Sequence, residues 1–262
     1  MADWQDDGAL AAQYADASNL AARQVLFARF STAERSRREW LFDQMESDQP
    51  ALPADADVLS LGAGHGVLWA ANCERIPDGW DVTVTDAFQG MVMDAMETLE
   101  ECQREFNFDV VDARDIPYPN DSFDVITANH VLQHLDAEGR ERAIAEVRRV
   151  LKPDGTLYAA TTGESHLAEL HDVLSGFGSV PHENGFSLEN GTDQLRAQFG
   201  DVDLRRFENS LSVTSAAPLV AYALSLPGFD DEDGREMETA FRERIGDDGF
   251  DVAMDVGVFV AR

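Results

Sequence analysis

The sequence predicts an α/β protein built on a mostly parallel sheet, and three observations support this. Between Asp57 and Thr162, short apolar runs alternate with helical stretches, which is the pattern of βαβ units with right-handed crossovers. A glycine-rich turn directly follows the first apolar run. The 262 residues, 44% of them hydrophobic, are enough to bury one large core. We therefore expect one core domain with covering segments.

The N-terminal segment reads as helical. Leu20, Gln24, Phe27 and neighbouring apolar positions recur at helical spacing up to about Met45, and prolines at 50 and 53 close the segment. We predict that residues 1–50 form a helical lid and that residues 51–262 form the main domain.

The central segment supplies five expected strands and three expected helices. The strands are DVLSLG, DVTVTD, FDVVDA, FDVITA and TLYAAT, and the helices lie in VLWAANCERI, MVMDAMETLEECQREF and RERAIAEVRRVL. We expect KPDG, at 152–155, to end the last helix and turn the chain into its strand, since proline cannot continue a helix.

The pattern loosens after residue 163. Helices are expected near 164–176, 191–199, 216–226 and 234–245, with strands near 202–207 and 250–260. Because this stretch follows the fifth strand and precedes a closing one, we expect elements within 164–250 to cover a substrate.

The charge is strongly acidic. Twenty Lys and Arg residues stand against fifty Asp and Glu residues, a formal net charge of −30, and Lys152 is the single lysine. Such a surface repels nucleic acid and resembles that of proteins from salt-loving cells, where concentrated salt screens self-repulsion.

Cysteine usage and the N-terminus favour a cytoplasmic protein. Cys73 and Cys102 show no CxxC spacing, so we expect buried, reduced thiols. The start, MADWQDDGAL, is acidic where a signal peptide is basic, and no apolar run approaches the length of a membrane span.

The strongest local signal is VLSLGAGHGVL at residues 58–68. Glycines at 62, 64 and 66 let backbone N–H groups approach a ligand at the start of a helix, which suits an anionic or nucleotide-like molecule. A dinucleotide fingerprint would place its third small residue at position 67, where Val67 stands, so NAD is disfavoured.

A second signal is Asp86, which ends the next expected strand. A carboxylate here suits both ribose hydroxyls of an adenosine. An N-cap for the following helix is the alternative interpretation, but having the loop and the acid in register favours binding.

Five segments together resemble the class I S-adenosylmethionine-dependent methyltransferases. They are VLSLGAGHG, VTVTDAF, DARDIPYPNDSFDVI, ANHVLQHL and RRVLKPDGTLYAAT, and the resemblance covers residues 55–163 in order and spacing. It implies a Rossmann-like three-layer αβα sandwich whose seven-stranded, mostly parallel sheet has an antiparallel last strand. FDVAMDVGVFVAR, at the C-terminal end, resembles that strand.

The resemblance also implies S-adenosyl-L-methionine as cofactor and a set of binding residues. Gly62, Ala63 and Gly64 would lie against the methionine part, and Asp86 with Ala87 would hold the ribose. Asp112 and the backbone of Ala113 would hold the adenine, and Asn129 would lie near the sulfonium. Ser60 departs from the family, which usually has an acid there. Tyr14, Arg23 and Arg29 are candidate lid contacts.

Methyl transfer needs mainly in-line placement of a nucleophile, with a general base where the acceptor is protonated. His130 and His134, one helical turn apart in HVLQHL, are the candidates. Their HxxxH spacing also suits a metal, but no third ligand is evident, so we expect no metal site.

Other functions stay open at this level. They are an NAD(P)-dependent oxidoreductase, a nucleic-acid methyltransferase, and a binding module that has lost transfer. We expect a small-molecule acceptor, because the chain lacks both a basic face and an Asn/Asp-Pro-Pro motif. The sequence does not define the acceptor, its reacting atom (O, N or C) or the oligomeric state.

Overall fold

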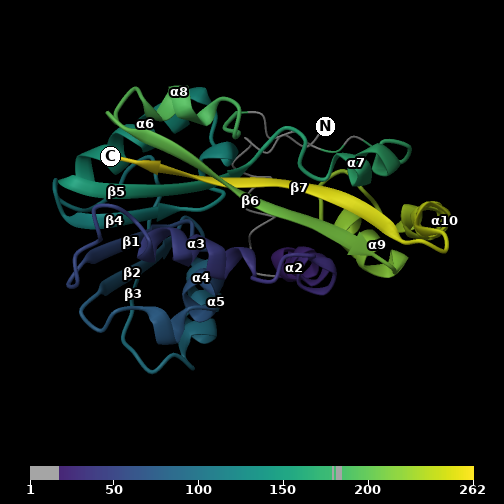
Figure 1. Ribbon diagram of the computed structural model, residues 1–262, viewed down its shortest axis with the longest axis horizontal. Coiled ribbons are helices and arrows are strands. Elements are labelled where there is room, and N and C mark those ends of the chain that lie inside the picture. Colours follow the sequence, from purple (N-terminus) through teal and green to yellow (C-terminus); the bar gives the residue numbers. More distant parts are fainter. Residues whose placement is uncertain (1–17, 179, 181–184) are drawn as a thin grey trace.

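The structure, a computed structural model, describes residues 18–178, 180 and 185–262 and centres on a seven-stranded sheet (Figure 1). The strand order is β3-β2-β1-β4-β5-β7-β6, and β7 runs antiparallel to both neighbours while the other pairs are parallel. This confirms the predicted sheet. The strands are β1 Asp57–Leu61, β2 Asp81–Asp86, β3 Asn107–Val110, β4 Phe123–Ala128, β5 Leu151–Thr162, β6 Val202–Val213 and β7 Phe250–Ala261.

Helices cover both faces of the sheet, as predicted. The α-helices are α2 Ser18–Phe30, α3 Arg37–Glu46, α4 Val67–Ala70, α5 Gln89–Leu99, α6 Ala137–Val150, α7 Ala168–Leu174, α8 Gly191–Leu195, α9 Ala216–Leu224 and α10 Gly234–Ile245. Three short 3₁₀ turns, at Cys73–Arg75, Leu132–His134 and Asp231–Asp233, complete the regular structure.

The alternation of side chains along the strands divides the core in two. On β5, Leu157 and Ala159 pack with α6 and α8 on one face, while Tyr158 and Ala160 pack with α3, α4 and α5 on the other. Successive strand residues point to opposite faces, so a strand that is apolar throughout must be covered on both sides.

A third hydrophobic cluster forms beyond the sheet proper. The β6–β7 pair is twelve residues long in each strand, and its far half packs against α2, α7, α9 and α10. Figure 1 shows these helices gathered around the far end of the two long strands. The cluster is built around Leu211, Phe241 and Phe250, each at most 1% exposed.

The N-terminal segment is broken into separate helices where the sequence predicted one helical stretch. Ser31 forms a bridge to Leu211 of β6, and Ser36 starts α3 through a reciprocal capping box with Glu39. Because Leu41 and Phe42 of α3 are buried in the sheet core, α3 and the glycine loop after β1 are held against the same face.

Two local expectations were wrong. KPDG does not form a turn: β5 already begins at Leu151, and the segment lies at a register shift between β4 and β5. Cys73 and Cys102 are not separate thiols but a disulfide, with Cα atoms 5.7 Å apart, which joins the turn after α4 to the end of α5.

Among the described residues, no helix has both the length and the apolar character needed to span a membrane.

Candidate functional site

The glycine loop leaves the carboxyl end of β1 with a backbone that needs glycine. Gly62, Gly64 and Gly66 have φ of 56°, 56° and 76°, values that side chains disfavour. A Cβ on Gly62 would also lie 2.4 Å from Cγ2 of Val131. The loop is anchored by the N–H of Ala63, which donates to the Thr85 carbonyl at 2.8 Å. Since α4 has only four residues, its dipole contributes little, and the loop itself defines the surface.

Asp86 lies at the end of β2, beside this loop. The carboxylate accepts the N–H of Gly64 at 2.9 Å and that of Phe88 at 3.0 Å, and the residue is only 8% exposed. Burial raises the pKa of Asp86, against the opposing effect of these backbone donors. Phe88, not Asp86, is the N-cap of α5, so the capping interpretation does not account for this acid.

Ser60 joins the neighbouring strands instead of supplying a charge. It is 2% exposed, and its hydroxyl accepts the hydroxyl proton of Thr127 at 3.0 Å. Its carbonyl accepts the hydroxyl of Thr85 at 2.9 Å. The serine therefore stays hydrogen-bonded at a position where a buried carboxylate would lose solvation.

Asp112 and Ala113 follow β3 at the same edge of the sheet. Arg114 donates to Asp112 through its backbone N–H at 2.8 Å and through its guanidinium at 2.7 and 3.0 Å. Burial opposes the charge of Asp112, but the Arg114 contacts outweigh it and lower the pKa of the carboxyl below its ordinary value. Asp112 is thus a fixed, charged acceptor.

The segment after β4 contains Asn129 and the two predicted catalytic histidines. Oδ1 of Asn129 is buried without a hydrogen-bond partner among the described residues. His130 has φ of 58°, so the chain leaves the helical region there, and only Leu132–His134 form a 3₁₀ turn. The expectation that His130 and His134 lie one helical turn apart was therefore wrong. Both histidines still line the same pocket as the glycine loop.

His130 is held between two side chains. Its Nε2 lies 3.0 Å from Nη1 of Arg37, and its Nδ1 lies 3.2 Å from the amide of Gln133. Burial first, then the charge of Arg37 and the other nearby histidines, holds the pKa of His130 well below its ordinary value. Because arginine only donates, Nε2 acts as acceptor, and its lone pair is already used.

Side chains from α2 and α3 also line the site. The sequence analysis did not identify them as site residues. Gln24 lies 3.2 Å from Nε2 of His65, while Arg37 and Arg38 project from the first turn of α3. Of the lid candidates, Arg23 bonds Ser225 at the end of α9 and Arg29 lies over the ring of Phe30, and neither lines the pocket. Tyr14 lies outside the described residues.

All ten residues predicted for binding or catalysis line one pocket of about 260 Å³. They come from four separate segments that end strands β1, β2, β3 and β4, and parallel strands bring their carboxyl ends to one edge. The pocket is also lined by Phe88, Met91 and Val111, which supply apolar surface.

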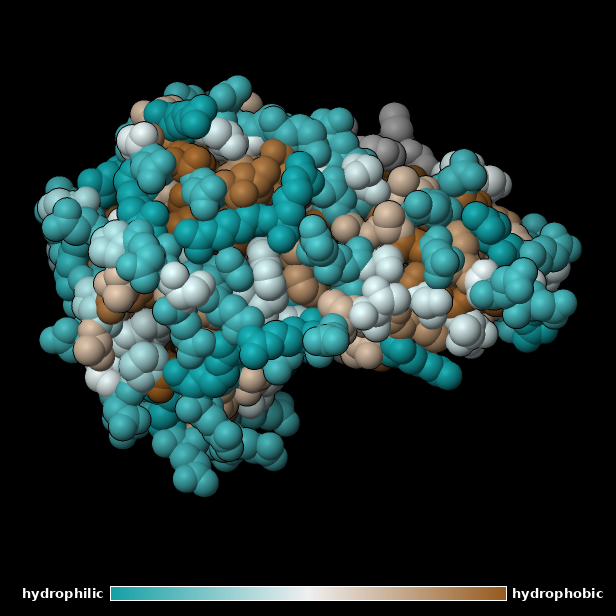
Figure 2. Space-filling view, viewed as in Figure 1, coloured by the Kyte–Doolittle hydropathy of each residue, from teal (hydrophilic) through white to brown (hydrophobic). Residues whose placement is uncertain are grey.

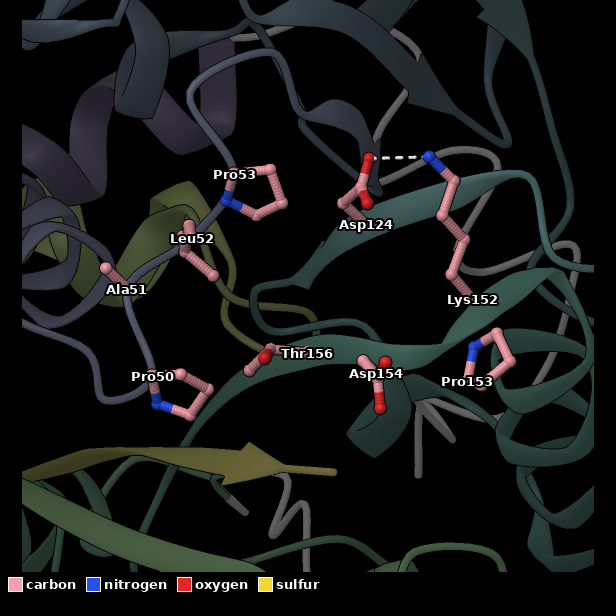
Figure 3. Close-up of a pocket in the computed structure, with 9 residues that line it drawn as sticks. All are labelled: Pro50, Ala51, Leu52, Pro53, Asp124, Lys152, Pro153, Asp154 and Thr156. Carbon is pink, nitrogen blue, oxygen red and sulfur yellow. Dashed lines mark hydrogen bonds and ion pairs between the residues drawn. The ribbon is translucent and has the colours of Figure 1, made fainter.

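A second hollow, about 390 Å³, lies at the opposite edge of the sheet (Figure 3). Figure 3 shows Lys152 directed at Asp124 across it, and the ammonium also contacts Asp57 at 2.8 Å. None of the ten predicted residues lines it, and Lys152 is already neutralised by its two carboxylates. Volume alone therefore does not identify the site, whereas convergence of the loop, the acids and Asn129 does.

Comparison with known proteins gives a family match over the same segment. Residues 58–155 match a family model described as a methyltransferase domain. This span runs from β1 into the start of β5 and includes the ten residues above.

Curated relatives resemble part of the chain. It is 32% identical over 147 residues to a malonyl-[acyl-carrier protein] O-methyltransferase of Methylococcus capsulatus, covering 56% of this chain and 52% of the relative. It is also 32% identical to a ubiquinone/menaquinone biosynthesis C-methyltransferase of Ralstonia pickettii, covering 48% and 52%. The chain spans about half the length of the curated relatives it matches.

Among solved structures, the fold is similar to that of a putative methyltransferase from Bacillus halodurans. The TM-score is 0.64 over 87% of this chain and 99% of the other, at 15% identity.

Proposed function

Because the chain belongs to the class I S-adenosylmethionine-dependent methyltransferases, we propose that it transfers the methyl group of S-adenosylmethionine to a small-molecule acceptor in the 260 Å³ pocket. The observation that carries this proposal is the convergence of the glycine loop, Asp86, Asp112 and Asn129 on one cavity.

The residues present fit the cofactor. The bare backbone at Gly62 lets the loop lie close against Val131 of the segment after β4, and the buried Oδ1 of Asn129 in that segment is a ready acceptor. The Asp86 carboxyl lies beside the Gly64 N–H, at a position suited to two vicinal hydroxyls. Buried polar groups without partners are uncommon, so Asn129 supports a ligand at this place.

We assign the parts of the pocket as follows. Gly62, Ala63 and Gly64 lie along the methionine part, and Asp86 with Ala87 binds the ribose. Asp112, fixed by Arg114, accepts the adenine amine, and the Ala113 N–H donates to the ring. Asn129 lies near the sulfonium.

Catalysis depends mainly on placement. Bound S-adenosylmethionine supplies an electrophilic methyl group, and the pocket orients the acceptor atom in line with it. His134 is the better general base of the two histidines, because the Nε2 lone pair of His130 is engaged by Arg37. For an acceptor that is already deprotonated, no base is required.

A small molecule is the acceptor class that the charge supports. The relatives are named for a carrier-bound malonyl group and for quinone biosynthesis, which differ in the methylated atom. A net charge of −30 opposes binding of nucleic acid. A cytoplasmic location and the lid role of residues 1–50 stay predictions.

The first experiment is calorimetry in molar potassium chloride with S-adenosylmethionine, S-adenosylhomocysteine and NAD(H). We expect micromolar binding of the two sulfur nucleotides, weakened at least tenfold in Asp86→Ala. Asp81→Ala is the matched control, because Asp81 begins the same strand and is exposed. Binding of NAD(H) alone would reassign the loop to redox chemistry.

A further inference from the structure

The wall of the pocket includes Arg37, which forms no ion pair among the described residues. Arg37 projects from the first turn of α3 and donates to Nε2 of His130 at 3.0 Å. No carboxylate in the described part of the chain forms an ion pair with it. Arginine has five N–H donors, so most of the guanidinium's donor capacity remains.

About half of the nineteen arginines form ion pairs in the described chain, so what distinguishes Arg37 is its place on the wall of the pocket. Nine other arginines form ion pairs with Asp or Glu in the described residues, namely those at positions 35, 75, 114, 142, 149, 205, 206, 242 and 262. A half-buried guanidinium that lines the pocket and has no ion pair in the described chain keeps donors that a ligand can use.

The surroundings of Arg37 favour an incoming anion. Burial, and then the charge of Arg38, lower the pKa of Arg37 to about 10, so it remains charged at neutral pH but poorly compensated. Burial, and then the charge of Arg37, lower the pKa values of His130 and His166. Nδ1 of His166 accepts the Asp255 N–H at 3.2 Å, so the ring proton lies on Nε2, and this ring is a donor too.

The acids of the pocket do not neutralise this corner. Asp86 is bonded to the backbone of Gly64 and Phe88, and Asp112 to Arg114. The pocket therefore has an acidic side, suited to an adenosine, and a cationic corner at Arg37, beside the neutral ring of His130.

Arg38 lies towards the other end of the pocket. Its charge acts on His65 of the glycine loop, whose Nδ1 is buried without a partner in the described chain. Arg38 and His65 thus face the part assigned to the methionine of the cofactor, and Arg37 faces the segment after β4. The two adjacent arginines serve different parts of the pocket.

We propose that Arg37 binds a carboxylate of the methyl acceptor, so that the substrates are small carboxylic acids. This inference rests on the proposed methyltransferase function. A bidentate guanidinium–carboxylate contact fixes both position and orientation, which is what in-line transfer requires. The cofactor also has a carboxylate that Arg37 could bind, and the experiment below distinguishes it from a carboxylate of the acceptor.

The test begins with cofactor binding to wild type, Arg37→Met and the control Arg35→Met. Arg35 is exposed and paired with Asp43, outside the pocket. Calorimetry measures S-adenosylhomocysteine, which has a carboxylate, and 5′-methylthioadenosine, which has none. We expect both affinities to change less than threefold in Arg37→Met. A tenfold loss for S-adenosylhomocysteine alone would assign Arg37 to the cofactor and overturn the proposal.

The second arm titrates malonate, succinate and benzoate into each protein saturated with S-adenosylhomocysteine, with malonamide as the uncharged probe. We expect at least one acid to bind wild type and Arg35→Met, with at least tenfold weaker binding to Arg37→Met and partial recovery in Arg37→Lys. Equal affinities across the variants, or binding by none of the acids, would overturn the proposal. Failure of wild type to bind S-adenosylhomocysteine would instead remove the proposed function itself.

A structural role for Arg37 makes a different prediction for stability. Removing a buried charge that lacks a carboxylate should leave Tm unchanged or raise it, because no ion pair is broken. A large fall in the Tm of Arg37→Met would show that the arginine supports the fold, and would count against the proposal.

Discussion

At the scale of the residue, the pocket keeps groups in states that cost stability. Asp86 is a buried acid with a raised pKa. Among the described residues, Arg37 forms no ion pair with a carboxylate and Oδ1 of Asn129 has no hydrogen-bond partner. Such groups are rarely retained for folding, since each would be more favourable in water. Their concentration in one cavity is what a binding site requires.

Asp86→Asn should stabilise the ligand-free protein. The raised pKa of Asp86 means that its folded state favours the protonated form, so stability falls as pH rises from the unfolded pKa through the folded one. The difference in Tm between Asp86→Asn and wild type should therefore grow between pH 4 and pH 7. Each kcal/mol of destabilisation that the substitution removes should raise Tm by roughly 2–4 °C.

Thermal unfolding in molar potassium chloride measures this, with Asp81→Asn as control. A gain that stays constant with pH, or that shrinks as pH rises, would contradict the role of burial.

At the scale of the element, pairing between strands determined the length of β6, which the local sequence pattern did not predict. Only 202–207 was predicted as strand in the sixth segment, whereas β6 runs from Val202 to Val213. Its second half, ENSLSV, contains residues of low strand propensity, and the twelve-residue ladder with β7 keeps it extended. The same ladder carries the third hydrophobic cluster, and α2, packed there, supplies Gln24 to the pocket.

The glycine loop allows a matched pair of substitutions. Gly62→Ala and Gly246→Ala both place a side chain at positive φ, 56° and 53°, and both should lower the stability of the fold. Only at Gly62 would the new Cβ meet Val131, at 2.4 Å, since nothing lies within 4 Å at Gly246.

We expect Gly62→Ala to weaken S-adenosylhomocysteine at least tenfold by calorimetry, and Gly246→Ala to bind as wild type. Similar affinities for both variants would show that the loop does not contact the ligand.

At the scale of the whole molecule, charge dominates. Figure 2 shows hydrophilic residues over most of the visible face, interrupted by apolar patches, and the net charge is −30. About half of the positive charges form local ion pairs in the described chain, such as Lys152 with Asp57 and Asp124. The remaining carboxylates repel one another over distances that salt screens.

Stability should therefore rise with salt. Between 0.05 and 3 M potassium chloride we expect Tm to increase by more than 10 °C. We expect most of this increase at salt concentrations higher than those that already screen the charges of a protein with an ordinary net charge. Differential scanning calorimetry at pH 7 measures it, and an unchanged Tm would remove the argument that the acidic surface is an adaptation to salt.

The sequence alone determined the α/β order, because that depends on local periodicity, and the resemblance of its motifs to a known family implied the antiparallel last strand and the binding residues that meet in the pocket. Tertiary structure decided the rest. The break before α3, the positive φ of His130, the Cys73–Cys102 pairing and the position of Arg37 all arise from contacts between segments far apart in the chain. Arg37 and His130 are 93 residues apart, and only packing of α3 against the sheet brings a guanidinium to the pocket edge, where its lack of a carboxylate becomes visible.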